Sequence, residues 1–472
     1  MRVLFAEYWC NMDAWLRSAI DYIAEWLQFQ LVGSQQPGVI LAIAHRGEII
    51  AEHAFGLANL DTSEKLTPRH RFRIASHSKS FTSAGILKLR EQRKLHLDDP
   101  VGQYVGDLHA EVAAQTIAQV LSHSAGLTRD GVNSGQFIDG RLYLNAEELR
   151  AELKKPPAIE PNTRFKYSNH GFALLGLLIE AITGEPYAAW IKREIVEAAG
   201  LKETEPNMPL PRGAPFARGH TRRLPLGRRL VIPGDNPTSA ITSAAGFVAT
   251  AADTARFFAQ LAPNARRSVI SRASRREIAR KHWRIPQNFE AYYGLGVAIG
   301  KTEGWDWFGH GGGFQGYISR TAVLADCDVA ISLLSNSIDG LAPFWMDGCF
   351  HILRNFQARG APLRRTRDWT GRWWTIWNAL DLVPMGNRVL VSNPHLLTPF
   401  MDASEIEILG RDKGRITAAT GYTSFGESVR RSRGKSGKVS DLWLAGVNLK
   451  PENALAAEME RRYARRKRRT RS

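Results

Sequence analysis

The chain has 472 residues, of which 44% are hydrophobic and 23% are charged, a composition that excludes bulk disorder and allows one to three folded domains. The formal net charge is +17, and part of the excess lies in an arginine-rich run that begins at Arg461. Because no nucleic-acid-binding module accompanies this run, we expect residues 451–472 to be a disordered basic tail rather than an arm that binds nucleic acid, lipid or an acidic partner.

The start of the chain is not typical of a signal peptide. Acidic residues from Glu7 to Glu25 interrupt any apolar stretch there. The longest apolar run, Phe172 to Ile179, is too short to span a membrane. We therefore expect a cytoplasmic protein without a membrane span.

The three cysteines lie far apart in the sequence. Cys10, Cys327 and Cys349 show no CxxC spacing, so neither a metal site nor a disulfide framework is expected. Cys327 and Cys349 lie in apolar stretches and are predicted to be core residues.

Hydrophobic periodicity predicts four elements in the first half of the chain. A hairpin runs from Gly38 to Gly56 with its turn at Arg46-Gly47, and helices are predicted over about 78–93 and 170–183. Before them lies an amphipathic helix with one apolar face, formed by Trp15, Leu16, Ile20, Ile23 and Trp26 or Leu27.

Strands return near residues 294–299, 314–324 and 329–334. Strands at both ends of a segment with helices between them predict an α/β sandwich, an antiparallel sheet with a helical subdomain, in which the first hairpin pairs with the last strands. After the Arg- and Pro-rich segment 359–367, short strands separated by turns predict a small all-β barrel over residues 366–450. Trp373 and Trp374 are expected to plug its end.

The first candidate for chemistry is the pair Ser76 and Lys79. Residues three apart on a helix share one face, and a desolvated lysine can take the proton of an adjacent serine. A helix N-terminus also favours a developing oxyanion. Because SxxK spacing occurs by chance on many helices, Lys79 could equally be a surface residue.

The second candidate is Tyr167-Ser168-Asn169, at the start of the predicted helix over 170–183. A tyrosine near a lysine can act as a base through its phenolate or pass a proton to the leaving group. Asn169 could hydrogen-bond Lys79 or a substrate amide, or it could simply cap the helix.

The third candidate is the run from Gly309 to Gly316, directly before a predicted strand. Its glycines would let a substrate lie against the strand edge, and the N–H of Gly313 could donate to an oxyanion. His310 would add a polar or cationic group. The alternative is a structural bulge or turn, and no Lys-Ser or Lys-Thr follows to make a phosphate-binding loop.

Taken in order, Ser76-x-x-Lys79, Tyr167-x-Asn169 and His310-Gly311-Gly312 resemble the motif set of β-lactamases and penicillin-binding proteins. The Tyr-x-Asn and His-x-Gly forms resemble the branch with class C β-lactamases, D-aminopeptidases, alkaline D-peptidases and family-VIII esterases. Further blocks of this type, such as TIAQVLSHSAGL, extend the similarity over about residues 15–355. The C-terminal part resembles the lipocalin-like domain of some D-aminopeptidase-like members.

The resemblance implies a β-lactamase-like hydrolase domain over residues 1–360 and a lipocalin-like barrel over 366–450. It makes Ser76 the nucleophile and Lys79 and Tyr167 an acid/base pair. Asn169 would orient the substrate and the lysine. No metal or organic cofactor is implied.

The same resemblance assigns the third motif to substrate binding. Backbone N–H groups of Ser76 and Gly313 would form the oxyanion hole, beside Gly312. His310 stands where other members have lysine, which puts recognition of a β-lactam carboxylate in doubt. His77 is a polar residue where the family often has an apolar one, so it either faces the cleft or has a structural role, and His123 is expected to be structural.

The expected activity is hydrolysis of an amide or ester through an acyl-enzyme on Ser76. A small peptide or amino-acid amide, with a D-residue as an option, is the first expectation for the substrate. A carboxylic ester is the second and a β-lactam the third. The rival of another class is a non-catalytic peptide-binding protein. The sequence contains no HExxH zinc motif and no Gly-x-Ser-x-Gly elbow, and it does not indicate an oligomeric state.

Overall fold

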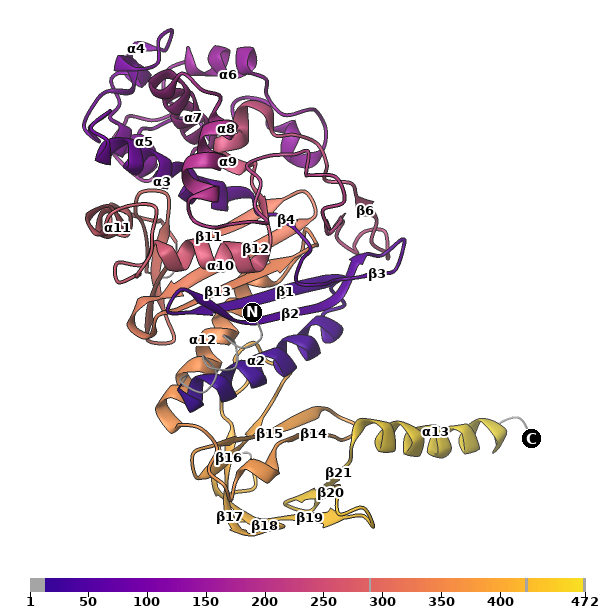
Figure 1. Ribbon diagram of the computed structural model, residues 1–472. Coiled ribbons are helices and arrows are strands. Elements are labelled where there is room, and N and C mark those ends of the chain that lie inside the picture. The colour runs from indigo at the N-terminus through magenta and orange to yellow at the C-terminus, as the bar shows by residue number, and fades with distance from the viewer. Residues whose placement is uncertain (1–12, 288–289, 421–422, 470–472) are drawn as a thin grey trace. The chain divides into compact units, whose positions relative to one another are not determined.

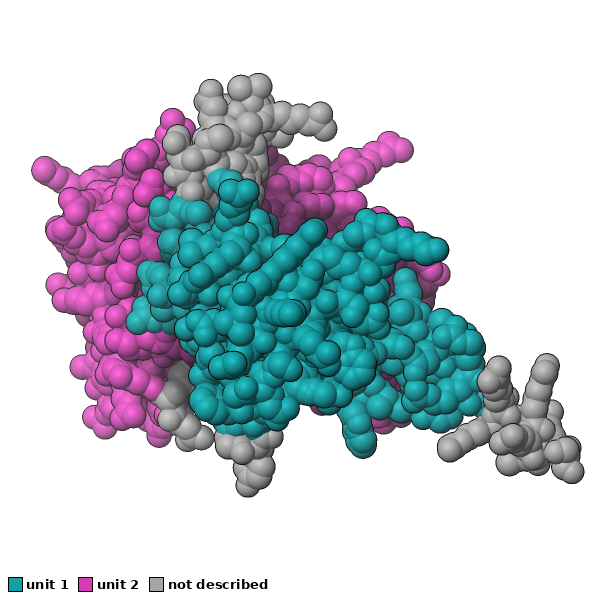
Figure 2. Space-filling model, turned by 90° about the horizontal axis from the view of Figure 1, so that it is seen from below, with its two compact units in different colours: residues 1–34, 347–472 teal, residues 35–346 magenta. Residues whose placement is uncertain are grey.

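The computed structural model describes residues 13–287, 290–420 and 423–469. The chain divides into two compact units, one of residues 35–346 and one that combines residues 1–34 with 347–472 (Figure 2). Each unit has its own large antiparallel sheet.

The larger unit is built on a nine-stranded antiparallel sheet with the order β3-β2-β1-β13-β12-β11-β10-β9-β8 (Figure 1). In the register, Val39 pairs with Ser335, so the first hairpin pairs with the last strand as the sequence predicts. The strands are β1 (Gly38–His45), β2 (Glu48–Asn59), β3 (Glu64–Lys65), β8 (Trp283–Arg284), β9 (Ala291–Tyr293), β10 (Ala298–Thr302), β11 (Trp305–Phe314), β12 (Tyr317–Leu324) and β13 (Val329–Ser335).

Helices from the middle of the chain complete this unit. Helix α10 (Ala251–Gln260) packs on β1, β12 and β13, and α3 (Ser78–Glu91) packs against α7 (Asn169–Thr183) and α9 (Thr242–Ala245). The other helices are α4 (Ala110–Ala113), α5 (Ile117–Leu121), α6 (Ala146–Leu153), α8 (Tyr187–Ile191) and α11 (Arg272–Ile278). Two short ladders pair β4 (Phe72–Arg73) with β7 (Val248–Ala249) and β5 (Gly219–His220) with β6 (Val231–Ile232).

The smaller unit contains an eight-stranded antiparallel sheet in which each strand pairs with the next. Trp374 and Lys450 exchange backbone hydrogen bonds of 2.8 and 3.0 Å, which nearly closes the sheet into a barrel. Its strands are β14 (Gly371–Trp374), β15 (Ala379–Met385), β16 (Arg388–Ser392), β17 (Ser404–Gly410), β18 (Lys413–Ala418), β19 (Ser428–Arg433), β20 (Val439–Leu444) and β21 (Val447–Leu449). The predicted architecture, an antiparallel sheet with a helical subdomain plus a small all-β barrel, is confirmed. Trp369 and Trp373 lie in the barrel core, whereas Trp374 is half-buried.

Two helices belong to the barrel unit although the sequence places them in the hydrolase domain. These are α2 (Ala14–Gly33) and most of α12 (Ala342–Arg359). Within this unit Gln30 of α2 donates to the carbonyl of Pro394 at 2.6 Å. An amphipathic face predicts that a helix is buried but does not identify its partner.

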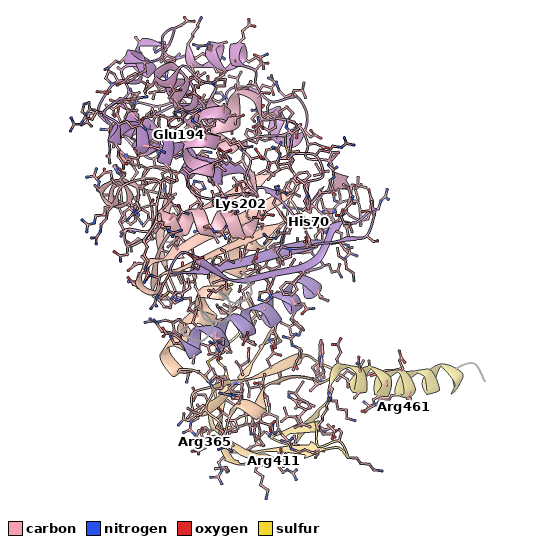
Figure 3. All side chains as sticks on the ribbon, viewed as in Figure 1. His70, Glu194, Lys202, Arg365, Arg411 and Arg461 are labelled. Carbon is pink, nitrogen blue, oxygen red and sulfur yellow. The ribbon has the colours of Figure 1, made fainter. Side chains whose placement is uncertain are left out.

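The C-terminal segment contains helix α13 (Glu452–Arg469) where the sequence predicts a disordered tail. Ala, Glu and Arg are strong helix formers, and Glu458 forms ion pairs with Lys450 and Arg462. Arg461 lies on this helix, and Arg365 and Arg411 lie elsewhere in the same unit (Figure 3).

The cysteines divide between two environments. Cys349 is buried as predicted, whereas Cys327 lies in a one-turn 3-10 helix and is only half-buried. Cys10 lies outside the described residues.

In the described ranges no single helix has the length and apolar composition of a membrane span. Helix α7 reaches that length and composition only together with residues 187–197, and the two segments are bent by 84° relative to each other.

Candidate active site

Ser76 lies in a single 3-10 turn (Ala75–His77) that leads directly into α3, rather than in the α-helix itself. The preceding residue, Ala75, has φ of +48°, a left-handed conformation that is strained for a residue with a Cβ. Lys79 lies one turn further on, and its Nζ is 3.2 Å from Ser76 Oγ. The tight turn and the following helix thus hold both side chains on one face.

The Lys79 amine is fully buried and has three polar neighbours. Its Nζ donates to Asn169 Oδ1 at 2.7 Å and to the carbonyl of Ala244 at 2.8 Å, besides its contact with Ser76. Burial lowers the pKa of Lys79 well below its usual value, and the charge of Asp130 opposes this shift only in part.

A neutral Lys79 amine would have a free lone pair beside Ser76. A neutral amine has two N–H groups and one lone pair, whereas a carbonyl oxygen only accepts. If Asn169 Oδ1 and the Ala244 carbonyl take the two N–H groups, the lone pair is left for the hydroxyl of Ser76. This is the arrangement that a general base requires.

Tyr167 contacts the same serine from the loop before α7. Its hydroxyl donates to Ser76 Oγ at 2.7 Å, and the Tyr167 ring is 4.7 Å from Lys79 Nζ. Burial raises the pKa of Tyr167, so the side chain is a neutral phenol at ordinary pH. Burial therefore favours the neutral amine of Lys79, which can accept a proton, and the neutral phenol of Tyr167, which can donate one. The roles of base and acid are thus separated between the two side chains.

Asn169 is the first residue of α7 and does not cap it. The cap is Ser168, whose Oγ accepts from the N–H of Gly171 at 2.8 Å and donates to the carbonyl of Thr128 at 2.6 Å. The Asn169 side chain is therefore available to Lys79, and its Nδ2 donates to Asp130 Oδ1 at 2.6 Å.

His310 and the three glycines that follow it, Gly311 to Gly313, lie inside strand β11, not before a strand. The imidazole is buried, its Nδ1 is 2.6 Å from the carbonyl of Gly311, and its Nε2 is 2.9 Å from the hydroxyl of Tyr293. Because a carbonyl only accepts, Nδ1 carries the proton and Nε2 accepts from Tyr293.

His310 is therefore a neutral polar group, and not the cationic group that was the other expectation from the sequence. Burial lowers the pKa of His310 well below its usual value, with nearby His77 and Lys79 acting in the same direction. Both ring nitrogens are already hydrogen-bonded within the protein, so His310 presents no positive charge to a substrate.

Gly312 and Gly313 have different environments. A Cβ on Gly312 would lie 2.2 Å from the carbonyl oxygen of Ile74, so this glycine permits β11 to approach the segment that carries Ser76. A Cβ on Gly313 would have no neighbour nearer than 3.7 Å, and Gly313 is exposed.

His77 does not face the cleft. It is fully buried, its Nδ1 is 2.8 Å from the carbonyl of Ile74, and its Nε2 is 3.0 Å from Thr321 Oγ1. Burial lowers the pKa of His77 to about 3, so its role is structural and neutral. His123 is likewise buried, and its Nδ1 accepts from the N–H of Ser168 at 3.1 Å.

Three residues near the site have no part in the sequence-based prediction: Arg129, Asp130 and Tyr293. Tyr293 lies in the segment YYGLG, which resembles another block of the same family and was the available signal. Its contact with His310, however, depends on the pairing of β9, β10 and β11. Arg129 and Asp130 follow the SHSAGL block, and no local motif distinguishes them from other charged loop residues.

A family model described as Beta-lactamase matches residues 23–343. Protein flp of Staphylococcus aureus (strain MW2) is 28% identical over 172 residues, which are 36% of this chain and 34% of flp. Penicillin-binding protein 4* of Bacillus subtilis (strain 168) is 31% identical over 181 residues, which are 37% of this chain and 40% of that protein. The chain thus aligns with well under half the length of these curated relatives.

Solved structures are similar over more of the chain. The octameric penicillin-binding protein homologue from Pyrococcus abyssi has a TM-score of 0.64 at 22% identity, covering 91% of this chain and 99% of that one. D-amino acid amidase from Ochrobactrum anthropi SV3, complexed with D-phenylalanine, has a TM-score of 0.63 at 22% identity, covering 72% and 99%. At these identities the similarity establishes the fold.

Proposed function

The chain belongs to the beta-lactamase family of serine hydrolases, and we propose that it hydrolyses an amide or ester bond through an acyl-enzyme on Ser76. The observation that carries this proposal is the position of Ser76 Oγ, 3.2 Å from Lys79 Nζ and 2.7 Å from the hydroxyl of Tyr167. A serine between a desolvated amine and a protonated phenol has both the base and the acid that acyl transfer needs.

In the proposed reaction, Lys79 takes the proton of Ser76 while Oγ attacks the substrate carbonyl carbon. The oxyanion that forms is stabilised by the backbone N–H groups of Ser76 and Gly313. When the tetrahedral intermediate collapses, the bond to the leaving group breaks and Tyr167 gives that group its proton. The ammonium of Lys79 then restores the phenol. Deacylation uses water in place of the leaving group, with the same two side chains.

The surroundings of the third motif bear on the substrate class. His310 is neutral with both nitrogens occupied, so it offers no positive charge to a carboxylate. The cation beside the motif is Arg320, whose Nη1 would lie 3.7 Å from a Cβ at Gly311. The proposed substrate class is a small peptide or amino-acid amide, and the fold shared with a D-amino acid amidase supports a D-residue.

A carboxylic ester is the second candidate, because the same acid and base would serve it and an ester likewise lacks a carboxylate on its leaving side. Hydrolysis of β-lactams ranks third, because these compounds carry a carboxylate and the neutral His310 offers it no charge.

A matched set of substrates tests this assignment. A phenylalanyl dipeptide with a C-terminal amide should be cleaved with a kcat/KM at least about tenfold, or 1.4 kcal/mol, above that of the same dipeptide with a free C-terminal carboxylate, because the neutral His310 gives that carboxylate no charge. Preferential cleavage of the carboxylate-bearing dipeptide, or of a penicillin, would contradict the proposed class. The variant Ser76→Ala should abolish every one of these activities.

A further inference from the structure

We propose that Asp130 is a positioning residue of this site, which fixes the side-chain amide of Asn169 in the one orientation that lets Lys79 act on Ser76. The inference rests on the proposed function. Asp130 lies in the loop between α5 and α6, and its side chain is only 11% exposed.

The orientation of the Asn169 amide follows from hydrogen-bond chemistry. Asp130 Oδ1 is 2.6 Å from one end of this amide, and an ionised carboxylate can only accept. The NH2 group must therefore face Asp130, which directs Oδ1 toward Lys79 Nζ at 2.7 Å. The opposite orientation would place two oxygens against each other.

This orientation decides where the lone pair of Lys79 points. With Asn169 Oδ1 and the Ala244 carbonyl as acceptors, both N–H groups of a neutral amine are used and the lone pair faces Ser76. With the amide reversed, its NH2 group would donate to that lone pair instead. Lys79 would then have no acceptor for the proton of Ser76.

The charge of Asp130 acts on the same amine. The Asp130 carboxylate favours the protonated form of Lys79, against burial and the nearby Arg129. Arg129 Nε is 3.1 Å from Asp130 Oδ2, but the Arg129 side chain is 67% exposed, so water screens this pair.

Burial keeps several titratable side chains around the amine and the carboxylate neutral. It lowers the pKa of His123 and His310 near Lys79 and of His170 beside Asp130, and it raises the pKa of Tyr167 and Tyr143.

The charged groups further out are Lys166, which acts on His123, and Glu152 and Lys155, which act on His170 and pair with each other at 2.6 Å. The negative charge that acts on Lys79 itself against burial is that of Asp130.

Two substitutions separate the hydrogen bond from the charge. Asp130→Asn keeps an acceptor oxygen for Asn169 but removes the charge, and Asp130→Ala removes both. The readout is the rate at which a fluorophosphonate labels Ser76, measured against pH. The acidic limb of this profile in Asp130→Asn should move to lower pH by roughly one unit, because Lys79 loses an opposing charge. The plateau in Asp130→Ala should fall by about tenfold to a hundredfold, because the base is misdirected.

The matched control is Asp107→Asn, which removes an exposed carboxylate that lies before α4 and pairs with Lys154. Its profile should coincide with that of the wild type. Thermal unfolding of each variant distinguishes misfolding from misdirection. Equal plateau losses in Asp130→Asn and Asp130→Ala with an unmoved acidic limb would overturn the inference.

A second measurement does not depend on catalysis. In protein labelled with [ε-13C]lysine, the Lys79 resonance, assigned by its loss in Lys79→Gln, reports the titration of the amine by NMR. Its midpoint should move to lower pH in Asp130→Asn. A wild type that is never labelled by the fluorophosphonate would contradict the proposed function alone, whereas an unmoved NMR midpoint would contradict the role of Asp130.

Discussion

At the scale of single residues, burial has opposite chemical consequences for the two groups that contact Ser76. It favours the neutral forms of both, and the neutral form of Lys79 is a base while the neutral form of Tyr167 is an acid. A base and an acid on one oxygen, 3.2 and 2.7 Å away, require no third titrating group. Ordinary desolvation thus produces the pair of roles that the reaction needs.

The acid role predicts a dependence on the leaving group. Tyr167→Phe should lower kcat/KM for an anilide by about a hundredfold or more, because the departing amine needs a proton. A p-nitrophenyl ester with the same acyl group should lose far less, because p-nitrophenolate departs without one. Equal losses for both substrates would show that Tyr167 does not act as the acid.

Contacts that follow from short sequence spacing were predictable, whereas those that depend on distant partners were not. Ser76 and Lys79 are one turn apart in any helical conformation, so their contact was predictable. The charge state of His310 was not, because it depends on Tyr293 and on burial between two strands. Asp130 gave no signal, because its importance comes from one contact with Asn169.

At the scale of elements, strand β11 determines how the third motif reaches Ser76. The glycines of this strand were expected to form a turn or to precede a strand, since glycine weakens strands. The strand forms because each glycine of the motif pairs with β12, for example Gly312 with Ser319 and Gly313 with Ile318. Gly312 also allows the backbone of β11 to pass close to the carbonyl of Ile74.

This close approach predicts the effect of a single methyl group. Gly312→Ala should destabilise the unit by about 1–3 kcal/mol, because its Cβ would clash with backbone that cannot move cheaply. Gly311→Ala, whose Cβ would meet nothing nearer than 3.5 Å, is the matched control. Urea unfolding of both variants measures the difference. Equal stability of the two would show that the strand tolerates the displacement.

At the scale of the whole molecule, the architecture of the sheet was predictable and the grouping of the helices was not. Alternating apolar patterns at both ends of the first 335 residues require a sheet that brings those ends together, as the pairing of β1 with β13 does. Helices α2 and α12 have apolar faces that either unit could cover. Only the packed structure assigns them to the unit that contains the barrel.

Within that unit, contacts between α2 and the barrel predict a stability effect at long sequence separation. The hydroxyl of Tyr22 lies 2.7 Å from Ser392 Oγ and 3.2 Å from Asp381 Oδ2, and it is buried. Tyr22→Phe should therefore lower the free energy of unfolding by about 1–3 kcal/mol, because partners are left unsatisfied. Tyr463→Phe, at an exposed position on α13, should change it little. Equal unfolding midpoints for both variants would contradict the contact.

The central claim, an acyl-enzyme on Ser76, is tested most directly by intact mass after treatment with a fluorophosphonate. The wild type and the control Ser134→Ala, which alters an exposed serine outside the site, should each gain one adduct, and Ser76→Ala should gain none. Peptide mapping should place the adduct on Ser76. A folded wild type that gains no adduct, or an adduct that persists in Ser76→Ala, would contradict the claim.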